Sequence, residues 1–315
     1  MGACPARGPQ GGAGETLVVS FTPVNDAVPH DAQTNDALPP DAGDDRHAAV
    51  AAVAFDLDGT LYLGEQVVPG APEVVEHVRA LGLRPLFLTN TTMRNPAQLA
   101  ARLAGLGIAA VADEIYSSAT AAARYAAERG HRVAYVVGSP VLRAELEEHG
   151  LRLTERGDQA DCLVVGFVPD FDPSTMPDGF RPECEFVAAN LDADYPVEGG
   201  VRMPGCLQTV ERVAARLGRS YDAVAGKPGT FMLECVEADL GLTPDEVVVV
   251  GDNLDSDVAM ARAAGCRSIL IEVHGGEGDA RTRAEERRES GEGGRPDATV
   301  TSLTDVPAAL ARLSL

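Results

Sequence analysis

The chain alternates short apolar runs with longer stretches in which apolar residues recur every three or four positions. Four runs, each followed by polar residues, have the composition of strands buried on both faces: 51–55, 83–88, 247–250 and 267–273. Helical spacing follows the first two at 69–81 and 95–107, and the second stretch begins with the favourable cap-and-proline pair Asn95-Pro96. This alternation predicts an α/β fold with a parallel sheet.

The same alternation restarts in the middle of the chain. Its spacing predicts helices and strands in the order 117–129, 132–137, 140–148, 161–168 and 185–189, of which the first and third are helices. We therefore expect a core made of 47–112 and 225–315, with a second α/β unit, 113–224, inserted between its two parts.

The two ends of the pattern differ in character. Residues 1–46 are rich in Gly, Pro, Ala and Asp, and we expect this segment to be disordered because it cannot bury enough apolar surface to offset its ordering entropy. Within it, 17–21 is the only apolar patch that suggests an edge strand or a partner-binding segment, and a start codon assigned too early is a second explanation. Residues 274–297 are expected to form a solvated loop, and 301–313 a closing helix.

Composition narrows the functional classes. The 315 residues are 45% apolar and 4% aromatic, with a formal net charge of −22. Such a charge disfavours nucleic acid and anionic membranes as partners. The six cysteines include no C-x-x-C pair, no apolar run reaches 18 residues, and the N-terminus lacks a basic, then apolar signal. We expect a cytoplasmic protein with reduced thiols.

Candidate chemistry begins at the end of the first apolar run. Asp56 and Asp58 are two positions apart, so an extended backbone points both carboxylates to one side of the strand end. Gly59 allows a tight turn there, which the Thr60 hydroxyl could close. Two crowded carboxylates need a shared proton or a cation, and Mg²⁺ prefers such oxygen ligands. The alternative is a turn with two solvated acids.

Three further polar groups follow predicted strands or turns. Thr89-Asn90 comes after the second run, Lys227 lies in the turn Gly226-Lys227-Pro228, and Asp252 and Asp257 follow the four valines. Each signal is weak alone, because a capping threonine, a solvated lysine or a helix-capping acid would give the same pattern. Their common position at element boundaries makes them one candidate site.

Taken in order, these motifs resemble the haloacid dehalogenase superfamily. Asp56-Leu57-Asp58-Gly59-Thr60-Leu61, Thr89-Asn90, Gly226-Lys227-Pro228 and Gly251-Asp252-x-x-x-x-Asp257 match its four motifs, in the form typical of class IIA phosphatases. The resemblance implies a Rossmann-like doubly wound parallel sheet with an inserted α/β cap domain. It also implies a Mg²⁺-dependent phosphatase for a small phosphomonoester, such as a sugar phosphate, phosphoglycolate or a nucleoside monophosphate.

The resemblance also assigns roles to individual residues. Asp56 would be the nucleophile, and Asp58 the general acid and base, with a pKa raised by the neighbouring acids. Lys227 would neutralise the phosphoryl group and Pro228 would start the next helix. The remaining roles are phosphate binding by Thr89 and Asn90, metal binding by Asp56, the Asp58 carbonyl and Asp252, and support by Asp257, Gly59 and Asn253.

Alternatives stay open within this resemblance. The same fold could transfer phosphate to an acceptor other than water, as a mutase does, or could serve a non-catalytic, ligand-binding regulatory role. The inserted unit would read the leaving group, with Asn190 and Asp192 among the candidate substrate contacts, although loops often contain such residues for their turns. Family members often dimerise through the cap, which makes a homodimer an expectation here.

Overall fold

The computed structural model describes residues 49–197, 201–272 and 295–313. The N-terminal segment 1–46, with its apolar patch 17–21, lies outside the described residues, as does most of the predicted loop 274–297. The described chain forms a six-stranded sheet and a five-stranded sheet, and both are parallel throughout. The predicted α/β fold of the Rossmann-like type is confirmed.

The six-stranded sheet has the order β15-β14-β13-β1-β4-β5. Its strands in chain order are β1 (Ala52–Asp56), β4 (Arg84–Thr89), β5 (Ile115–Ser117), β13 (Val247–Gly251), β14 (Arg267–Ile271) and β15 (Ala298–Val300). After β1, the chain adds β4 and β5 on one side of it, and later adds β13, β14 and β15 on the other side. In open parallel sheets, the crevice at such a reversal is where ligands bind.

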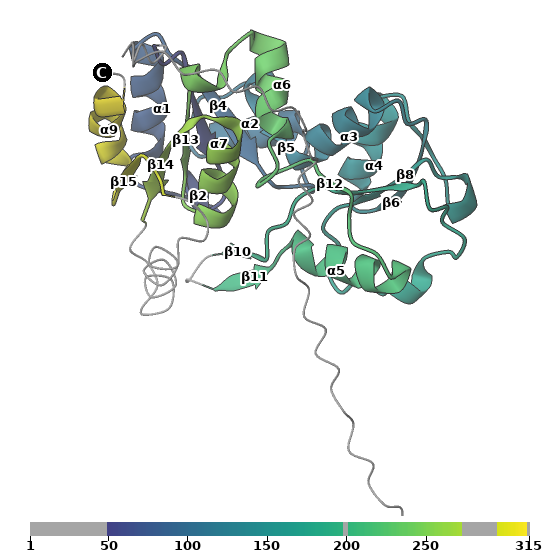
Figure 1. Cartoon of the computed structure of the whole chain (residues 1–315). Helices are drawn as coiled ribbons and strands as arrows, with labels where there is room; N and C mark the ends of the chain where they lie inside the picture. The colour runs from purple at the N-terminus through teal and green to yellow at the C-terminus, as the bar shows by residue number, and fades with distance from the viewer. Residues whose placement is uncertain (1–48, 198–200, 273–294, 314–315) are drawn as a thin grey trace, which may run out of the picture. The chain divides into compact units, whose positions relative to one another are not determined.

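Helices cover both faces of this sheet, as Figure 1 shows. On one face, Val53, Phe55 and Phe87 belong to a buried apolar cluster with α1 (Ala71–Ala80), α2 (Pro96–Gly105) and α9 (Val306–Leu313). The other face packs against α6 (Phe231–Leu240) and α7 (Ala259–Ala264). Full burial of one such aliphatic or aromatic side chain stabilises a fold by roughly 1.5–3 kcal/mol.

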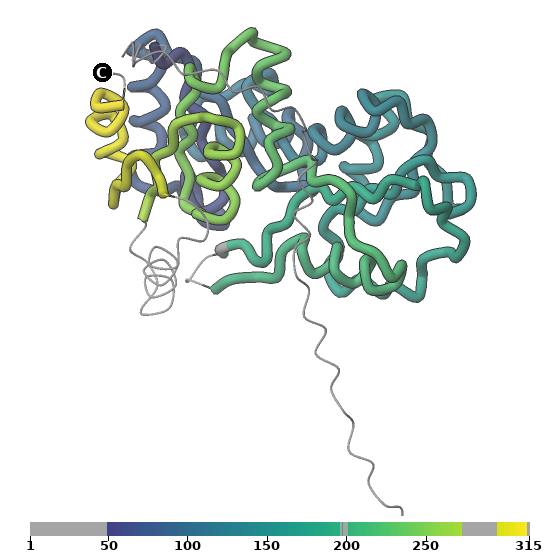
Figure 2. Tube along the Cα trace, viewed as in Figure 1, coloured from purple at the N-terminus to yellow at the C-terminus, as the bar shows by residue number. Residues whose placement is uncertain are grey.

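The five-stranded sheet has the order β12-β9-β8-β6-β7 and comes from the middle of the chain. Its strands in chain order are β6 (Val133–Val137), β7 (Arg152–Leu153), β8 (Cys162–Val165), β9 (Glu185–Ala188) and β12 (Ala223–Val224). One face packs on α3 (Ser118–Glu128) and α4 (Pro140–Glu148), and the other on α5 (Cys206–Leu217). The teal middle of the chain forms this sheet in Figure 2, whereas early and late segments share the other.

Two short hairpins lie outside these sheets, and the sequence pattern does not predict them. The first joins β2 (Tyr62–Leu63) to β3 (Gln66–Val67), directly after β1. The second joins β10 (Asp194–Pro196) to β11 (Arg202–Pro204), directly after β9. Strands of two or three residues are too short to show an alternating pattern, so sequence periodicity gives no signal for them.

The longer predicted elements are confirmed, within a few residues at their ends. Asn95 caps α2 in a capping box with Gln98, as the cap-and-proline pair predicts. The prediction that Pro228 starts a helix is wrong, because α6 begins three residues later, at Phe231. Pro228 instead follows a cis peptide bond in a tight turn, which the Gly229 N–H closes on the Gly226 carbonyl at 2.7 Å.

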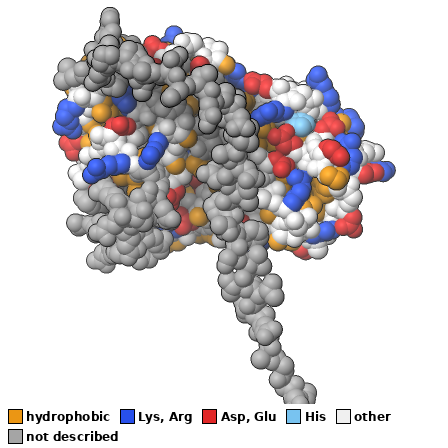
Figure 3. All heavy atoms as spheres, in the orientation of Figure 1, with side chains coloured by type: hydrophobic (Ala, Val, Ile, Leu, Met, Phe, Trp, Pro, Cys, Tyr) orange, Lys and Arg blue, Asp and Glu red, His pale blue; other side chains and the backbone are white. Residues whose placement is uncertain are grey.

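The division at residue 113 into core and cap stays a prediction, and the strand pairing bears on it. The strand β5, at 115–117, pairs with β4 in the six-stranded sheet, two residues beyond the expected start of the second unit. Within the described residues, no helix is long and apolar enough to cross a membrane. Lys and Arg side chains lie among Asp and Glu side chains on the face drawn in Figure 3.

Candidate active site

The predicted site residues meet at the carboxyl ends of three adjacent strands. Asp56 is the last residue of β1, Thr89 is the last residue of β4, and Asp252 follows the last residue of β13. Because β1 lies between the other two in the parallel sheet, these three ends are neighbours at one edge. The six-stranded sheet therefore gathers a nucleophile candidate, a hydroxyl and a second carboxylate at its reversal point.

The turn after β1 has a shape that only glycine permits. Gly59 has φ +105°, and a Cβ on it would lie 2.4 Å from Oδ2 of Asp252. The absence of a side chain thus allows the backbone after Asp58 to approach the second carboxylate closely. The expectation for Thr60 is wrong, since its hydroxyl is buried and has no hydrogen-bond partner among the described residues.

Lys227 lies at the centre of the site, and its ammonium is fully hydrogen-bonded. Nζ donates to Oδ1 of Asp56 at 2.5 Å, to Oδ1 of Asp257 at 2.7 Å and to the Leu88 carbonyl at 3.1 Å. The side chain is 2% exposed, so these charges interact with little solvent screening. The lysine consequently holds the end of β1 and the helical turn at 254–258 in a fixed relation.

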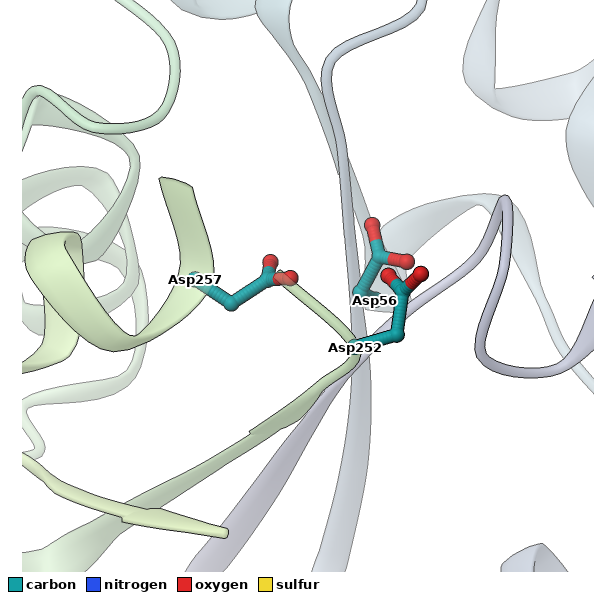
Figure 4. Close-up of side chains that lie close together, drawn as sticks. All are labelled: Asp56, Asp252 and Asp257. Carbon is teal, nitrogen blue, oxygen red and sulfur yellow. The ribbon is translucent and has the colours of Figure 1, made fainter. Parts of the chain in front are cut away.

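Three carboxylates form a compact acidic cluster beside this lysine. One oxygen each from Asp56, Asp252 and Asp257 lies within 4.8 Å of the other two. Figure 4 shows Asp56 and Asp252 at their strand ends and Asp257 reaching toward them from its helical turn. The second oxygen of Asp56, Oδ2, is buried and has no hydrogen-bond partner among the described residues. A hard divalent cation would satisfy it, so the residues present fit a metal ion.

The pKa shifts of the cluster also indicate that a bound cation would be stabilising. Burial raises the pKa of Asp56 well above its usual range, Lys227 opposes the increase, and Asp257 and Asp252 add to it. Burial also raises the pKa of Asp252 to about 7, with Asp257 as the next cause. At Lys227 burial lowers the pKa, but Asp257 and Asp56 outweigh burial and raise it. One ammonium thus faces three acids, and a further cation would stabilise their ionised forms.

Asp58 lies in a different environment from Asp56. Its Oδ2 accepts a hydrogen bond of 3.2 Å from the Tyr62 hydroxyl, in the hairpin that follows. The pKa of Asp58 is raised mainly by burial, and Tyr62 is the largest opposing influence. The direction is the expected one, but burial rather than the neighbouring acids is the leading cause. A raised pKa favours the protonated form of this carboxyl, which is the form that a general acid requires.

Tyr62 is itself fixed from two sides. Its side chain is 1% exposed, and the guanidinium of Arg102 lies over the ring, 4.6 Å from its centre. Arg102 in turn pairs with Glu65 at 2.8 Å and donates to the Gly64 carbonyl, both in the turn of the same hairpin. Helix α2 thereby holds the β2–β3 hairpin, and the hairpin holds Asp58.

Asn90 occupies a place that differs from its predicted role in binding phosphate. Its Oδ1 accepts from the Lys227 N–H at 2.9 Å, and its Nδ2 donates to the Lys227 carbonyl at 3.0 Å. The second N–H of Nδ2 donates to Oδ1 of Asp192 at 2.9 Å. Both amide hydrogens are therefore used within the protein, and the side chain acts as a clamp on the lysine backbone. A contact of Thr89 and Asn90 with phosphate stays a prediction.

The remaining predicted residues lie around this centre. The Thr89 hydroxyl is buried and accepts from the Thr91 N–H at 3.2 Å. Asn253 caps the helical turn at 254–258 through the Asp255 N–H, and its own N–H donates to Oδ2 of Asp257 at 3.2 Å. Gly251 makes room for that carboxylate, because a Cβ there would lie 2.3 Å from it. These residues place Asp257 so that it can pair with Lys227.

Sequence reasoning missed Tyr62 and Arg102, and it assigned Asp192 only to substrate contact. Tyr62 lies within the apolar run after the DxDGT motif, where its ring suggests core packing, and nothing near it in sequence indicates Arg102 as a partner. Asp192 lies 102 residues beyond Asn90, so only the folded chain brings them together. The polar tip of an otherwise buried tyrosine is the one signal that points to a hydrogen-bonded role.

Comparison with known proteins places this geometry among phosphatases. A family model described as haloacid dehalogenase-like hydrolase matches residues 53–152, and a related HAD-hydrolase-like model matches 224–306. The two matches together contain all four motifs, from Asp56 in the first to Asp257 in the last. The segment between the matches carries the strands β8 and β9 of the five-stranded sheet, and α5.

Relatives and solved structures agree with these matches. Glycerol-3-phosphate phosphatase from Homo sapiens is 34% identical over 256 residues, which are 71% of this chain and 79% of the relative. The structure of p-nitrophenyl phosphatase from Archaeoglobus fulgidus superposes with a TM-score of 0.71 and 27% identity, covering 83% of this chain and all of that one.

A third similar protein has been solved with metal ions. Glycerol phosphate phosphatase from Mycobacterium tuberculosis, in complex with magnesium, superposes with a TM-score of 0.68 and 29% identity. The match covers 81% of this chain and 76% of that one. The same protein has a structure in complex with calcium. Divalent cations thus accompany this fold in a similar protein.

Proposed function

The chain belongs to class IIA of the haloacid dehalogenase-like hydrolases and is a phosphoric monoester hydrolase, and from this premise we propose that it is a Mg²⁺-dependent phosphatase of small alkyl phosphomonoesters. The observation that carries the proposal is the cluster of Lys227 with Asp56, Asp252 and Asp257, in which one oxygen of Asp56 is buried without a partner among the described residues. Such a site offers a nucleophile, a fixed ammonium and a place for a cation within one small volume.

The first step proposed is phosphoryl transfer to Asp56. Its carboxylate attacks phosphorus, an O–P bond forms on Asp56, and the ester O–P bond breaks on the opposite side. Asp58 gives its proton to the leaving alkoxide, so that the alcohol departs neutral. The positive charge of Lys227 and the hydroxyl of Thr89 stabilise the negative charge on the phosphoryl oxygens in the transition state.

The second step proposed is hydrolysis of the aspartyl-phosphate. Asp58, now ionised, takes a proton from a water molecule, and this water attacks phosphorus. The Asp56 O–P bond breaks, inorganic phosphate leaves, and Asp58 is protonated again. Tyr62 holds Oδ2 of Asp58 through both steps, and the other carboxyl oxygen is left to exchange the proton.

The metal ion has residues ready to hold it. Asp56 and Asp252 would bind it, with the Asp58 carbonyl as the third protein ligand and Asp257 beside them. When bound, Mg²⁺ neutralises charge between the nucleophile and the phosphoryl oxygens. We infer Mg²⁺ rather than Ca²⁺ because a site with so few carboxylates, completed by water and substrate phosphate, suits the smaller ion.

The substrate is proposed from the relatives and from the chemistry of Asp58. Two similar proteins are named for glycerol phosphates, whose leaving alkoxide needs a proton donor, and Asp58, whose pKa is raised, is placed in this role. In this proposal the five-stranded sheet, with the β10–β11 hairpin, acts as the cap that contacts the alcohol. A homodimer through this part and a cytoplasmic location stay predictions.

The test is phosphate release from a panel of esters. The panel holds glycerol phosphate, a sugar phosphate, phosphoglycolate, a nucleoside monophosphate and p-nitrophenyl phosphate, each with Mg²⁺, with Ca²⁺ and with a chelator. We expect turnover with Mg²⁺, and a loss of at least about 1,000-fold in Asp56→Asn, because the nucleophile is removed. Transfer of phosphate to an added alcohol instead of water would favour the phosphotransferase alternative. Absence of turnover on every ester would contradict the proposal.

A further inference from the structure

Asp192 is a carboxylate next to Asn90 that the steps above do not use. It lies four residues after β9, in the segment that leads to the β10–β11 hairpin, and its N–H donates to Oδ1 of Asn190 at 3.2 Å. Asn190 in turn donates to the Asn90 carbonyl at 2.7 Å. The segment after β9 is therefore tied to the loop that follows β4.

The contact between Asp192 and Asn90 completes the bonding of the Asn90 amide. One amide hydrogen goes to the Lys227 carbonyl and the other to Asp192, while Oδ1 accepts from the Lys227 N–H. An amide held at all of these points has one orientation, because rotation by half a turn would place oxygen against the Asp192 carboxylate. Asp192 thus adds to the backbone contacts that hold the orientation in which Asn90 clamps Lys227.

The clamp matters because it fixes the backbone from which the ammonium extends. Lys227 lies in a turn with glycines close by on both sides, and a Cβ on Gly226 would lie 2.7 Å from Oδ1 of Asn90. This close approach lets the Asn90 amide pair with the lysine backbone as a strand would. A shift of this backbone would move Nζ away from Asp56 and Asp257, to which it is bonded.

Neighbouring charges agree with this arrangement. Burial raises the pKa of Asp192 to about 6, and Lys227 and the hydrogen bond from Asn90 are the largest opposing influences. Ionised Asp192 is therefore stabilised by the groups that it is argued to position. The hydrogen bond itself needs only an acceptor oxygen, which an asparagine at this place would also offer.

We propose that Asp192 is a positioning residue for phosphoryl transfer, which orients the Asn90 amide and through it holds the Lys227 ammonium between Asp56 and Asp257. The inference rests on the proposed phosphatase function. It links the segment after β9 to the charge of the phosphoryl site, without a contact between Asp192 and the substrate.

The first experiment compares Asp192→Ala with Asp192→Asn. Both are assayed with Mg²⁺ on glycerol phosphate and on p-nitrophenyl phosphate, whose leaving group needs little help from an acid. We expect Asp192→Ala to lower kcat about tenfold on both esters, the equivalent of one strong hydrogen bond, with KM changed less than kcat. Asp192→Asn keeps the acceptor and is expected to retain kcat within about twofold. Asp178→Ala, at a carboxylate that is 89% exposed, is the matched control.

The second experiment asks whether Asp192 acts through Asn90. In an Asn90→Ala background the amide is absent, so adding Asp192→Ala is expected to lower kcat by less than about twofold more. Thermal denaturation of each variant checks that it is folded. If Asn90→Ala does not fold, the comparison of alanine with asparagine at residue 192 decides the question alone.

Several results would overturn the inference while leaving the phosphatase intact. A loss confined to glycerol phosphate with a raised KM would make Asp192 a contact of the alcohol. Equal losses in Asp192→Ala and Asp192→Asn would assign the effect to charge, and multiplicative losses with Asn90→Ala would remove the link to the clamp. An unchanged Asp192→Ala would leave it without a role. Failure of the wild type on every ester is distinct, and would overturn the proposed function instead.

Discussion

The two parallel sheets of this protein are built alike, yet their central strands end differently. At the carboxyl end of the six-stranded sheet, β1, β4 and β13 lead to Asp56, Thr89 and Asp252, around a buried lysine. At the corresponding end of the five-stranded sheet, β6 and β8 lead to Gly138 and Gly166. The ends of β6 and β8 therefore carry no side chain, whereas Asp192 and Lys227 of the charged site follow β9 and β12 of the same sheet.

The glycines of the second sheet make room for another part of the chain. Thr92, which is 1% exposed, lies against Gly166, where a Cβ would come within 3.2 Å of its hydroxyl oxygen. Its hydroxyl accepts from the Phe167 N–H at 3.3 Å, and its carbonyl accepts from the Ser139 hydroxyl. The loop after β4 thus fills the crevice at which a parallel sheet would otherwise bind a ligand.

The difference shows what a strand end needs to become a site. The geometry of a parallel sheet offers converging backbone ends in both cases. Within the described ranges, only the first sheet adds carboxylates whose charges a single lysine does not balance, together with a buried carboxylate oxygen that a cation would satisfy. Unbalanced charge at the strand ends, rather than the fold, distinguishes the reactive sheet.

The largest expected effect comes from removing the lysine. Lys227→Met leaves the buried Asp56 and Asp257 carboxylates without their ammonium, so we expect the free energy of unfolding to fall by about 3–5 kcal/mol in a chelator at neutral pH. We also expect kcat to fall at least about 100-fold with Mg²⁺. Chemical denaturation and phosphate release measure the two effects.

A pair on the five-stranded side supplies the control. Arg216→Met removes the partner of Asp178 on the surface of α5, and an exposed pair of this kind contributes at most about 1 kcal/mol. Comparable losses in Lys227→Met and Arg216→Met would contradict the view that the charged strand ends depend on their lysine.

The next effect is a dependence of stability on pH in the first sheet. Burial, with Asp257 as the next cause, raises the pKa of Asp252 to about 7 in the folded chain, above the value of about 4 for an unfolded aspartate. Protonation therefore favours the folded state, and this contribution, complete below pH 4, is lost as the pH rises through 7. In a chelator at pH 8, Asp252→Asn should be more stable than the wild type by on the order of 1–3 kcal/mol.

The difference in stability between the wild type and Asp252→Asn should vanish near pH 4, where the wild-type carboxyl is also neutral. Adding Mg²⁺ at pH 8 should reverse the order, because the cation binds the carboxylate and not the amide. Thermal denaturation across this pH range measures both. A wild type that gains stability relative to Asp252→Asn as the pH rises without metal would contradict the assignment.

The smallest effect is expected at the filled crevice of the second sheet. Thr92→Val keeps the shape of the side chain but leaves the Phe167 N–H without its acceptor, which should cost about 1–2 kcal/mol of stability. We expect kcat to stay within about twofold, since the side chain takes no part in the charged cluster. A loss of kcat of tenfold or more, in a folded protein, would mean that the end of the second sheet contributes to the function of the charged site.

Much of the fold was predictable because local rules agree with the global structure. The valine run before Asp252 and the cap at Asn95 each indicate one element, and each is present. The meeting of Asp56 with Asp252 follows from parallel strands, although 196 residues separate them in the sequence. Charged residues that directly follow apolar runs are therefore informative at the level of sequence alone.

What could not be predicted depends on contacts between distant side chains. Nothing in the sequence near Asn90 indicates that its amide pairs with the Lys227 backbone, 137 residues away. The turn at Pro228 was misjudged for a similar reason, since proline suits a helix start and a tight turn equally well. Local patterns give elements and their ends, but partners of polar side chains are fixed only by packing.

The four residues from Thr89 to Thr92 also matter for anyone who would recombine such enzymes. Asn90 holds the lysine that pairs with Asp56 at the end of the six-stranded sheet, and Thr92 contacts the end of the five-stranded sheet, although both residues belong to the loop after β4. A chimera that replaces the five-stranded sheet alone would set Thr92 against foreign glycines and Asn90 against a foreign acid. A chimera made to exchange specificity should therefore change parent sequence before Asn90. The loop after β4 and the five-stranded sheet whose end it closes would then come from the same protein.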